Sequence, residues 1–343
     1  MKHNNQEAVN HTDAYTPMNS TSQESYDIVG IGASTLDTFL VIDHFPSGRE
    51  VQKVLTSIRD GGGPVATALV TASKYGARTA MIDVVGNDSA GESIIGDFQK
   101  YGVHIDAIAI DKGASSAAAT ILVKADTGER AIFFEPSTAS DLVWQESYDE
   151  LLQSATIIHM NGRHRSIMMG AIQCAMQCGA VLSLDGGAQR YDKELGSIAE
   201  QCHIVIVARD FGEKYTGTTD LEEAVHIIHN RGALIAGITD GAKGSHFVGP
   251  KGEYYYCPAY EQVSVVDTTG AGDSFHGAFL AKIGEYIRRH EGDPRDILLH
   301  ISQEELEKAA HFASAVAALN TQHIGGRSGL PALEDITAIM DRE

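Results

Sequence analysis

Residues 265–277 read Val-Val-Asp-Thr-Thr-Gly-Ala-Gly-Asp-Ser-Phe-His-Gly, and an amphipathic stretch follows to about Ile287. The glycines of this segment therefore stand where a helix begins. A helix start exposes unpaired N–H groups and the positive end of the helix dipole, and glycine lets an anion approach that backbone closely. We predict that the backbone of Gly270, Ala271 and Gly272 forms an anion hole that needs no lysine.

Asp273 lies in the first turn of the expected helix, beside the predicted anion hole. An aspartate in this position is placed to accept the proton of an attacking hydroxyl as its bond to phosphorus forms. The alternative is that the glycines make a tight turn and Asp273 caps the helix. The fixed order of an aspartate, two threonines, Gly-Ala-Gly and a second aspartate is more specific than an isolated glycine-rich loop, and it favours phosphoryl transfer. No Gly-Lys-Ser/Thr follows, so the segment is not a Walker A loop.

Upstream of this segment, short β-rich runs alternate with helical patterns from Tyr26 onward. Such alternation predicts a parallel sheet covered by helices, and we expect one doubly wound α/β sheet. Glycines end several of the helical patterns, where the left-handed position after a helix favours them. These glycines are Gly76, Gly102, Gly179 and Gly232; the expected strands cover residues 28–31, 79–85, 156–160, 180–184, 204–207 and 234–238, and the first two expected helices cover 64–75 and 91–101.

Two segments break this pattern, residues 36–59 and 117–134, because both alternate apolar and polar side chains at a period of two. We expect antiparallel strands in both. In the second segment, Asp126-Thr127-Gly128 predicts a hairpin turn. Together the strands form a candidate lid, of the kind that phosphoryl-transfer enzymes use to exclude water from the reactive phosphate.

The formal net charge of −20 disfavours nucleic acid or an anionic membrane as a partner, because the long-range field repels phosphate groups. Anionic ligands must therefore be held by local devices such as the predicted anion hole. No stretch approaches the roughly 18 apolar residues of a membrane span, and the first residues lack the apolar core of a signal peptide, so we expect a cytoplasmic protein. Residues 1–25 are rich in Asn, Thr, Ser and Gln, and we expect a disordered tail there.

Residues 267–273 resemble the C-terminal signature of the ribokinase or PfkB family of carbohydrate kinases. Residues 61–68 resemble the glycine-rich sugar-binding segment of that family, residues 85–91 the turn that follows it, and residues 239–244 a nucleotide-site loop. The resemblance implies a Rossmann-like αβα kinase domain over residues 26–335, with a small β-sheet lid that often mediates homodimers. It also implies ATP with Mg²⁺, a sugar substrate and a K⁺ ion.

The resemblance assigns roles to individual residues. Asp273 is the implied base, with the backbone of residues 270–272 as the anion hole. Asp37 falls where the family binds substrate hydroxyls, although a solvated turn residue is the alternative. Gly62 and Gly63 let a sugar lie close to the backbone, and they also suit a helix-entry turn. The implied nucleotide-binding residues are Thr239, Gly241, Gly244, Ala315 and Gly325, and the implied monovalent-cation ligands are Asp267 and Thr269.

The chain departs from the family pattern at two places. Ala66 stands where most relatives have a sugar-binding asparagine, with Thr67 beside it. The Asn-x-x-Glu pair that helps to organise magnesium is also absent from residues 208–211. Either Asp210 and Glu213 substitute for that pair, or they lie on a surface turn.

The motifs are most similar to the sulfofructose kinase branch, with ketohexokinases next. In that branch an arginine at the position of Arg163 helps to hold a sulfonate, for which a guanidinium is suited. The alternative for Arg163 is a surface salt bridge, since the lysine and asparagine expected alongside it are replaced by Val51 and Phe134. We therefore predict ATP-dependent phosphorylation of a hydroxyl on a ketose or related furanose that can carry an anionic group. The alternatives are a nucleoside or keto-deoxy-sugar-acid kinase, and a catalytically weak sugar sensor.

Overall fold

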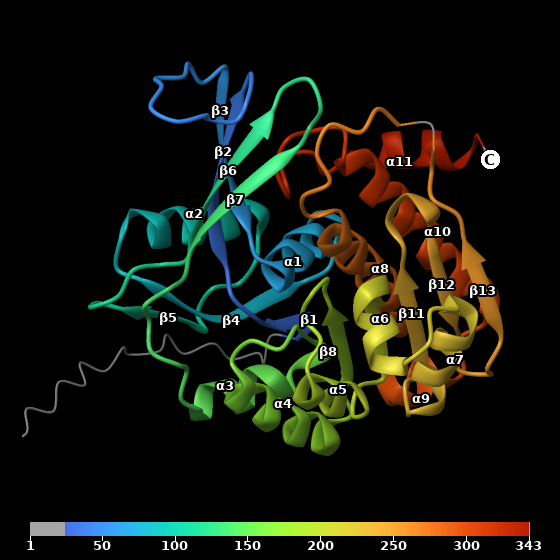
Figure 1. Cartoon of the computed structure of the whole chain (residues 1–343). Coiled ribbons are helices and arrows are strands. Elements are labelled where there is room, and N and C mark those ends of the chain that lie inside the picture. Colours follow the sequence, from blue (N-terminus) through green and yellow to red (C-terminus); the bar gives the residue numbers. More distant parts are fainter. Residues whose placement is uncertain (1–24, 262, 343) are drawn as a thin grey trace, which may run out of the picture.

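The computed structural model describes residues 25–261 and 263–342, so the expected tail of residues 1–25 lies outside the described residues except for Ser25. A nine-stranded sheet crosses the molecule (Figure 1). Its neighbouring strands run parallel from β11 to β5, whereas β12 and β13 are antiparallel to their neighbours. This arrangement confirms the predicted doubly wound sheet. In spatial order its strands are β13 (Tyr254–Cys257), β12 (Ser245–Val248), β11 (Ile235–Thr239), β10 (Ile204–Ala208), β9 (Val181–Gly186), β8 (Ala155–Met160), β1 (Tyr26–Ile31), β4 (Thr79–Gly86) and β5 (Ile108–Asp111).

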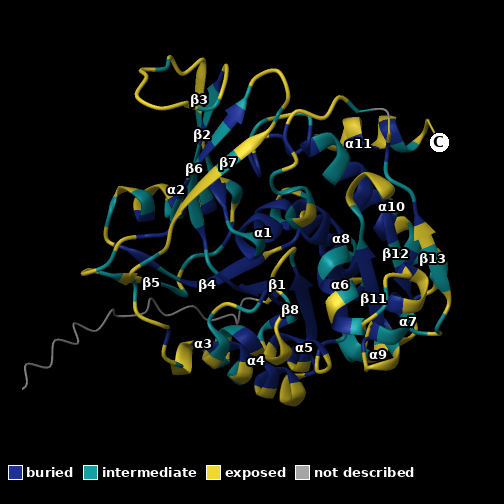
Figure 2. Ribbon diagram, viewed as in Figure 1, coloured by how far each residue is buried: buried dark blue, intermediate teal, exposed yellow. Residues whose placement is uncertain are grey.

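Helices cover both faces of this sheet, because successive side chains of each strand point to opposite sides. In β1, Val29 and Ile31 lie in one buried apolar cluster and Ile28 in the other. Figure 2 shows most strands of the main sheet as buried. The cluster of Val29 is covered by α3 (Glu146–Gln153), α4 (Arg165–Cys178), α5 (Lys193–Ala199), α6 (Arg209–Thr216) and α7 (Leu221–Asn230). The cluster of Ile28 is covered by α1 (Pro64–Lys74), α2 (Ser89–Tyr101), α8 (Ala271–Arg288), α9 (Pro294–Leu299), α10 (Gln303–Asn320) and α11 (Leu333–Met340).

The helix ends follow the predicted glycines. Gly76, Gly102, Gly179 and Gly232 all have positive φ, as expected after a helix. Within the described residues, no helix combines the length and the apolar composition that a membrane span requires.

A second, smaller sheet projects from the main body (Figure 1). Its strand order is β3 (Thr56–Gly62), β2 (Thr35–Ile42), β6 (Ala118–Lys124) and β7 (Arg130–Glu135). The predicted hairpin turn is confirmed, since Gly128 has φ 68° and donates its N–H to Lys124 O at 2.8 Å. The prediction of antiparallel strands is wrong for the central pair, because β2 and β6 run parallel. The chain passes through β4 and β5 of the main sheet between them, and such a long crossover permits parallel pairing.

Candidate active site

A cavity of about 450 Å³ lies where the strand order of the main sheet reverses. In the sheet, β4 and β5 lie on one side of β1, and β8 to β11 lie on the other side. The loops after β1 and β8 therefore part and leave a crevice at the carboxyl ends of the strands, which is the usual ligand site of such sheets. Ser34, which follows β1, and Asn161, which follows β8, both line the cavity.

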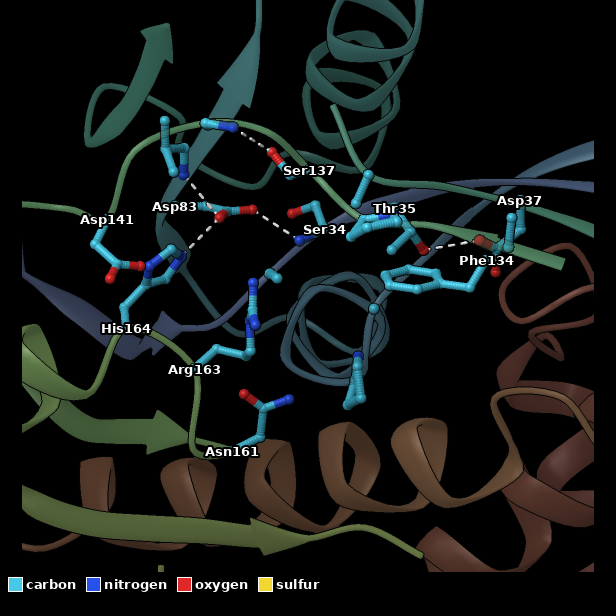
Figure 3. A pocket seen from close by; sticks show the side chains of 18 of the residues that line it. Ser34, Thr35, Asp37, Asp83, Phe134, Ser137, Asp141, Asn161, Arg163 and His164 are labelled. Carbon is cyan, nitrogen blue, oxygen red and sulfur yellow. Dashed lines mark hydrogen bonds and ion pairs between the residues drawn. The ribbon is translucent and has the colours of Figure 1, made fainter. Parts of the chain in front are cut away.

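Asp83 on β4 ties these two loops together (Figure 3). One carboxylate oxygen accepts a hydrogen bond from Ser34 N at 2.7 Å, and the other lies 3.0 Å from His164 Nε2. Asn161 nearby is only 2% exposed, and its side-chain amide has no hydrogen-bond partner among the described residues. A buried amide without a partner costs free energy, so a polar ligand in the cavity would satisfy it.

Two arginines also line this cavity, Arg163 in the loop after β8 and Arg190 in the loop after β9. Neither side chain forms an ion pair with a carboxylate among the described residues, so the surface salt bridge considered for Arg163 is not present. Phe134, at the position where a polar group was expected, lines the cavity as well. Val51 is fully exposed and takes no part in it.

Asp37 lies on the cavity wall formed by β2. Burial raises the pKa of its carboxyl group, although a hydrogen bond of 2.8 Å from Thr35 Oγ1 opposes the rise. A Cβ atom on Gly62 would come within 2.2 Å of this carboxylate, and one on Gly63 would meet Ala33 O at 2.1 Å. Gly63 also has φ 91°, which favours glycine, whereas a side chain at Gly62 would displace the Asp37 carboxylate.

The predicted anion hole lies at a junction of three glycine segments. Gly270 caps α8 with φ 71°, and a Cβ atom there would lie 2.7 Å from the Cα atom of Gly326. A Cβ atom on Gly326 would in turn lie 3.6 Å from Gly61 O. At Gly272 a Cβ atom would meet no other atom within 4 Å, so the backbone there is open to a ligand.

The buried carboxylate of Asp267 holds the segment that leads into this junction. It accepts hydrogen bonds from Thr269 N at 2.9 Å and from Gly325 N at 3.0 Å. It also accepts a hydrogen bond of 2.9 Å from Arg130, the first residue of β7. The two residues predicted to hold a monovalent cation, Asp267 and Thr269, are thus already bound to each other and to an arginine.

Asp273 is partly buried in the first turn of α8. Burial raises the pKa of this carboxyl group to about 6, and the Asp185 carboxylate adds to the rise, whereas His276, Arg190 and Arg327 oppose it. Asp185, on β9, lies 3.3 Å from His276 Nε2. Burial favours the neutral form of Asp185, but the charge and hydrogen bond of His276, together with His159 and Arg190, lower its pKa. The protonation state of Asp273 therefore changes near pH 6.

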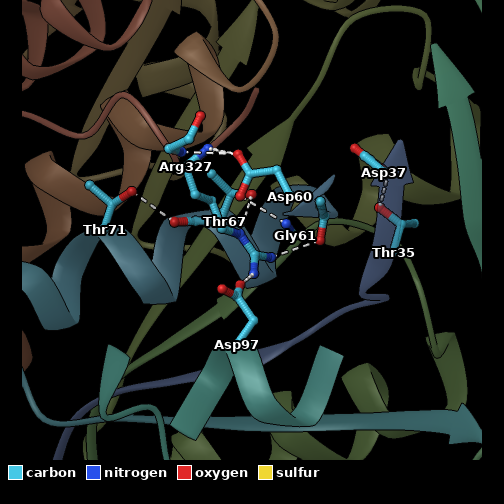
Figure 4. Close-up of polar contacts among 10 residues, drawn as sticks. Thr35, Asp37, Asp60, Gly61, Thr67, Thr71, Asp97 and Arg327 are labelled. Atoms are coloured by element: carbon cyan, nitrogen blue, oxygen red, sulfur yellow. Dashed lines mark hydrogen bonds and ion pairs between the residues drawn. The ribbon is translucent and has the colours of Figure 1, made fainter. Parts of the chain in front are cut away.

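Arg327, which follows Gly325 and Gly326, contacts both the small sheet and α2 (Figure 4). Its guanidinium, which is almost fully buried, donates to Asp97, to Gly62 O at 2.8 Å and to Thr67 Oγ1 at 3.1 Å. Asp60 on β3 accepts from the backbone N–H of Arg327 at 2.8 Å. The glycine-rich segment at residues 61–63 is therefore positioned by a side chain more than 260 residues away in sequence.

A protein-family model described as "pfkB family carbohydrate kinase" matches residues 27–333. The chain belongs to the pfkB family of carbohydrate kinases. This confirms the resemblance inferred from residues 267–273.

Similar pfkB kinases are found by sequence and by structure. Fructokinase-2 of Solanum habrochaites is 28% identical over 321 residues, which cover 88% of this chain and 94% of that protein. Probable fructokinase-2 of Arabidopsis thaliana is 30% identical over 312 residues, which cover 85% and 91%. The structure of Arabidopsis thaliana ribokinase complexed with ribose and ATP shares the fold, with a TM-score of 0.74 and 20% identity over 92% of this chain and 99% of that one. The protein is therefore an ATP-dependent carbohydrate kinase.

The structure explains one departure from the pfkB pattern. Ala66 is fully buried, and Thr67 beside it accepts its hydrogen bond from Arg327 inside the protein. Neither side chain lines the cavity, so Thr67 does not replace the missing asparagine. Asn161, whose side chain has no hydrogen-bond partner among the described residues, lines the cavity from the loop after β8.

The second departure concerns magnesium. Glu213 is bound by Arg209 at 2.7 Å, and Arg209 also reaches Asp240 at 2.8 Å. Asp210 accepts a hydrogen bond from Gln189 N at 2.7 Å. The described residues contain no group of three or more His, Cys, Asp or Glu side chains that could hold a metal ion. Asp210 and Glu213 lie on α6, and their role in place of the missing pair stays a prediction.

The predicted nucleotide residues fall into two groups. Thr239 ends β11. Gly241 begins the short 3-10 helix η1 (Gly241–Lys243) and Gly244 follows it, and both glycines have positive φ. Gly325 lies at the glycine junction, with φ 111°. Ala315 is fully buried within α10, and its predicted nucleotide contact stays a prediction.

The sequence reasoning missed four residues: Asn161, Asp185, Arg190 and Arg327. The first three stand at or just after the carboxyl ends of β8 and β9, and a polar residue that ends a buried strand is a signal that could have found them. Arg327 had no such local signal, because its partners lie in the first third of the chain.

Proposed function

We propose that this kinase transfers the γ-phosphoryl group of ATP to a hydroxyl of a ketose or related furanose, with Asp273 as the base. The observation that carries the proposal is the carboxyl group of Asp273, whose pKa is raised to about 6 at the start of a helix headed by glycines. An ionised Asp273 accepts the proton of the attacking hydroxyl, and the amides of residues 270–272 stabilise the charge on the transferred group. A pure sugar sensor has no need of such a base.

We further propose that the substrate carries an anionic group. Arg163 and Arg190 line the cavity and form no ion pair with a carboxylate among the described residues, and a guanidinium binds a sulfonate, phosphate or carboxylate through two parallel hydrogen bonds. Asn161 and Asp37 remain for the sugar hydroxyls. The same two arginines favour a keto-deoxy-sugar acid as the second candidate substrate.

Magnesium enters this proposal with the nucleotide. The residues at the expected Asn-x-x-Glu position are engaged in ion pairs and backbone contacts, so the phosphates and water would supply most of the ligands of Mg²⁺. When bound, the ion would offset the negative charge of the transferred phosphate.

We also propose that the small sheet acts as a lid and as a homodimer surface, in a cytoplasmic enzyme. On β7, Ile132 and Phe133 are 61% and 59% exposed, as Figure 2 shows for most of this strand. Because successive side chains of a strand point to opposite faces, β7 exposes an apolar side chain on each face, and such exposure is typical of a protein interface. Light scattering tests this by measuring the molar mass of the wild type, expected to be a dimer, and of Phe133→Lys, expected to be a monomer. A monomeric wild type would contradict the dimer.

The test of the function is ATP-dependent phosphorylation of fructose, sulfofructose, tagatose, ribose, keto-deoxy-gluconate and several nucleosides. Asp273→Asn is expected to lower turnover by about two orders of magnitude or more, because a positioned base contributes about 10²–10⁴-fold. Asp106→Asn, at an exposed carboxylate, is the matched control. Near-normal turnover in Asp273→Asn would show that Asp273 is not the base. If an uncharged sugar were turned over fastest, the proposal of an anionic substrate would be wrong.

A further inference from the structure

Arg130 reaches from the small sheet into the segment that leads to the anion hole. Its guanidinium donates to Asp267 Oδ1 at 2.9 Å, to Thr268 Oγ1 at 3.0 Å and to the hydroxyl of Thr269. Thr269 in turn donates to Asp267 at 2.7 Å. One side chain of β7 therefore contacts three consecutive residues immediately before Gly270.

The hairpin turn before β7 makes a second contact with the same segment. A Cβ atom on Gly128 would lie 3.2 Å from Val266 O, so the turn lies directly against the backbone there. On the other side, Val266 N and Asp267 N donate to Thr321 O at the end of α10, at 2.8 and 3.0 Å. The segment is thus enclosed between the hairpin and the main body.

The carboxylate of Asp267 needs a positive partner at this position. Its side chain is 0% exposed, and a buried carboxylate without compensation is costly. A monovalent cation that used Asp267 Oδ1 or the hydroxyl of Thr269 would compete with Arg130, which already donates to both oxygens. Because a guanidinium 2.9 Å from the carboxylate also repels a second cation, the residues present do not fit such an ion.

We propose that Arg130 takes the place of the monovalent cation and positions the anion hole. The guanidinium neutralises Asp267 and orders residues 267–269, and thereby Gly270 and the start of α8. Two consequences follow: nucleotide binding does not need K⁺, and the anion hole is complete only when the hairpin is docked. The inference rests on the proposed role of residues 270–272 in binding phosphate.

The test measures the affinity of a non-hydrolysable ATP analogue with Mg²⁺ by calorimetry, in KCl and in choline chloride at equal ionic strength. The proteins are the wild type, Arg130→Met, Arg130→Lys and the control Arg59→Met, which changes an exposed arginine on β3 of the same sheet. The wild type and the control should bind equally, within about twofold, in both salts. Arg130→Met should bind at least tenfold more weakly in choline chloride, and KCl should restore part of the loss. Arg130→Lys keeps the charge but not the forked geometry, so its affinity in choline chloride should lie between those of the wild type and Arg130→Met.

Two outcomes would overturn the proposal: a wild type whose affinity rises several-fold in KCl, or Arg130→Met that binds as the wild type does in both salts. If Arg130→Met fails to fold, the salt comparison on the wild type and Arg130→Lys still decides. The readout needs no sugar, so failure of the whole substrate panel would count against the proposed function and leave this measurement valid.

Discussion

The imidazole of His276 and the carboxylate of Asp185 lie 3.3 Å apart, and both are almost fully buried. His276 follows Asp273 by one turn of α8, while Asp185 comes from β9 of the main sheet. The proposed base therefore stands beside a buried pair of groups that act on its pKa in opposite directions, Asp185 upward and His276 downward.

Activity should fall as the pH is lowered through about 6, because Asp273 accepts a proton only when ionised. The measurement is kcat/KM for the best substrate between pH 5 and 8. A flat profile down to pH 5 would contradict the raised pKa.

Asp185→Asn should shift the loss of activity at acid pH to lower pH. Its negative charge is one cause of the raised pKa of Asp273, so its removal makes Asp273 more acidic. The pH profiles of variant and wild type, taken with the same substrate, provide the comparison. If activity were instead lost at a higher pH than in the wild type, the prediction would be wrong, and loss of the charge on Asp185 would act mainly through His276.

Asp273→Asn should be more stable than the wild type as well as less active. The folded pKa of Asp273 lies above its unfolded value, so this group's contribution to the free energy of unfolding decreases as the pH rises from about 4 to 6, and ionised Asp273 destabilises the fold at neutral pH. Removal of the charge should raise the thermal midpoint at pH 7.5, by about 2–4 °C for each kcal/mol recovered. The difference should shrink at pH 5, and a variant that melts below the wild type at both pH values would contradict the expectation.

Gly270→Ala and Gly272→Ala form a matched pair. At Gly270 the added methyl group meets Gly326 and the backbone has φ 71°, so stability and nucleotide affinity should both fall. At Gly272 the methyl group meets open space, so the thermal midpoint should stay within about 1 °C while ATP affinity falls, because the ligand approaches there. Thermal melts and calorimetry with an ATP analogue separate the two effects, and unchanged affinity in Gly272→Ala would place the phosphate elsewhere.

Arg327→Met should destabilise the protein by about 3–5 kcal/mol, because it leaves Asp97 without its partner in a buried network. Denaturant unfolding measures the loss, and Asp97→Asn alone should cost less. The double variant should lose less free energy of unfolding than the sum of the losses of the two single variants. Strict additivity would show that the pair is not coupled.

Local signals predicted the sheet, the helix-end glycines and the signature segment, because each depends on residues that are neighbours in sequence. The 267–273 order placed Asp273 at a helix start, where the structure has it. What local signals could not show is which distant side chain completes each contact. Arg130 with Asp267 and Arg327 with Gly62 join segments that periodicity treats separately, and the parallel pairing of β2 with β6 depends on a crossover through another sheet.

The glycine junction also sets an order of events during synthesis. Gly61, Gly270 and Gly326 come together from the first fifth, the last quarter and the final twenty residues of the chain. Contacts of such long sequence separation form late in folding, after the local elements are in place. A growing chain on the ribosome therefore cannot assemble this junction until Gly326 has emerged, long after Gly61, so a chain stalled before that residue would lack the backbone on which the proposed phosphate site depends.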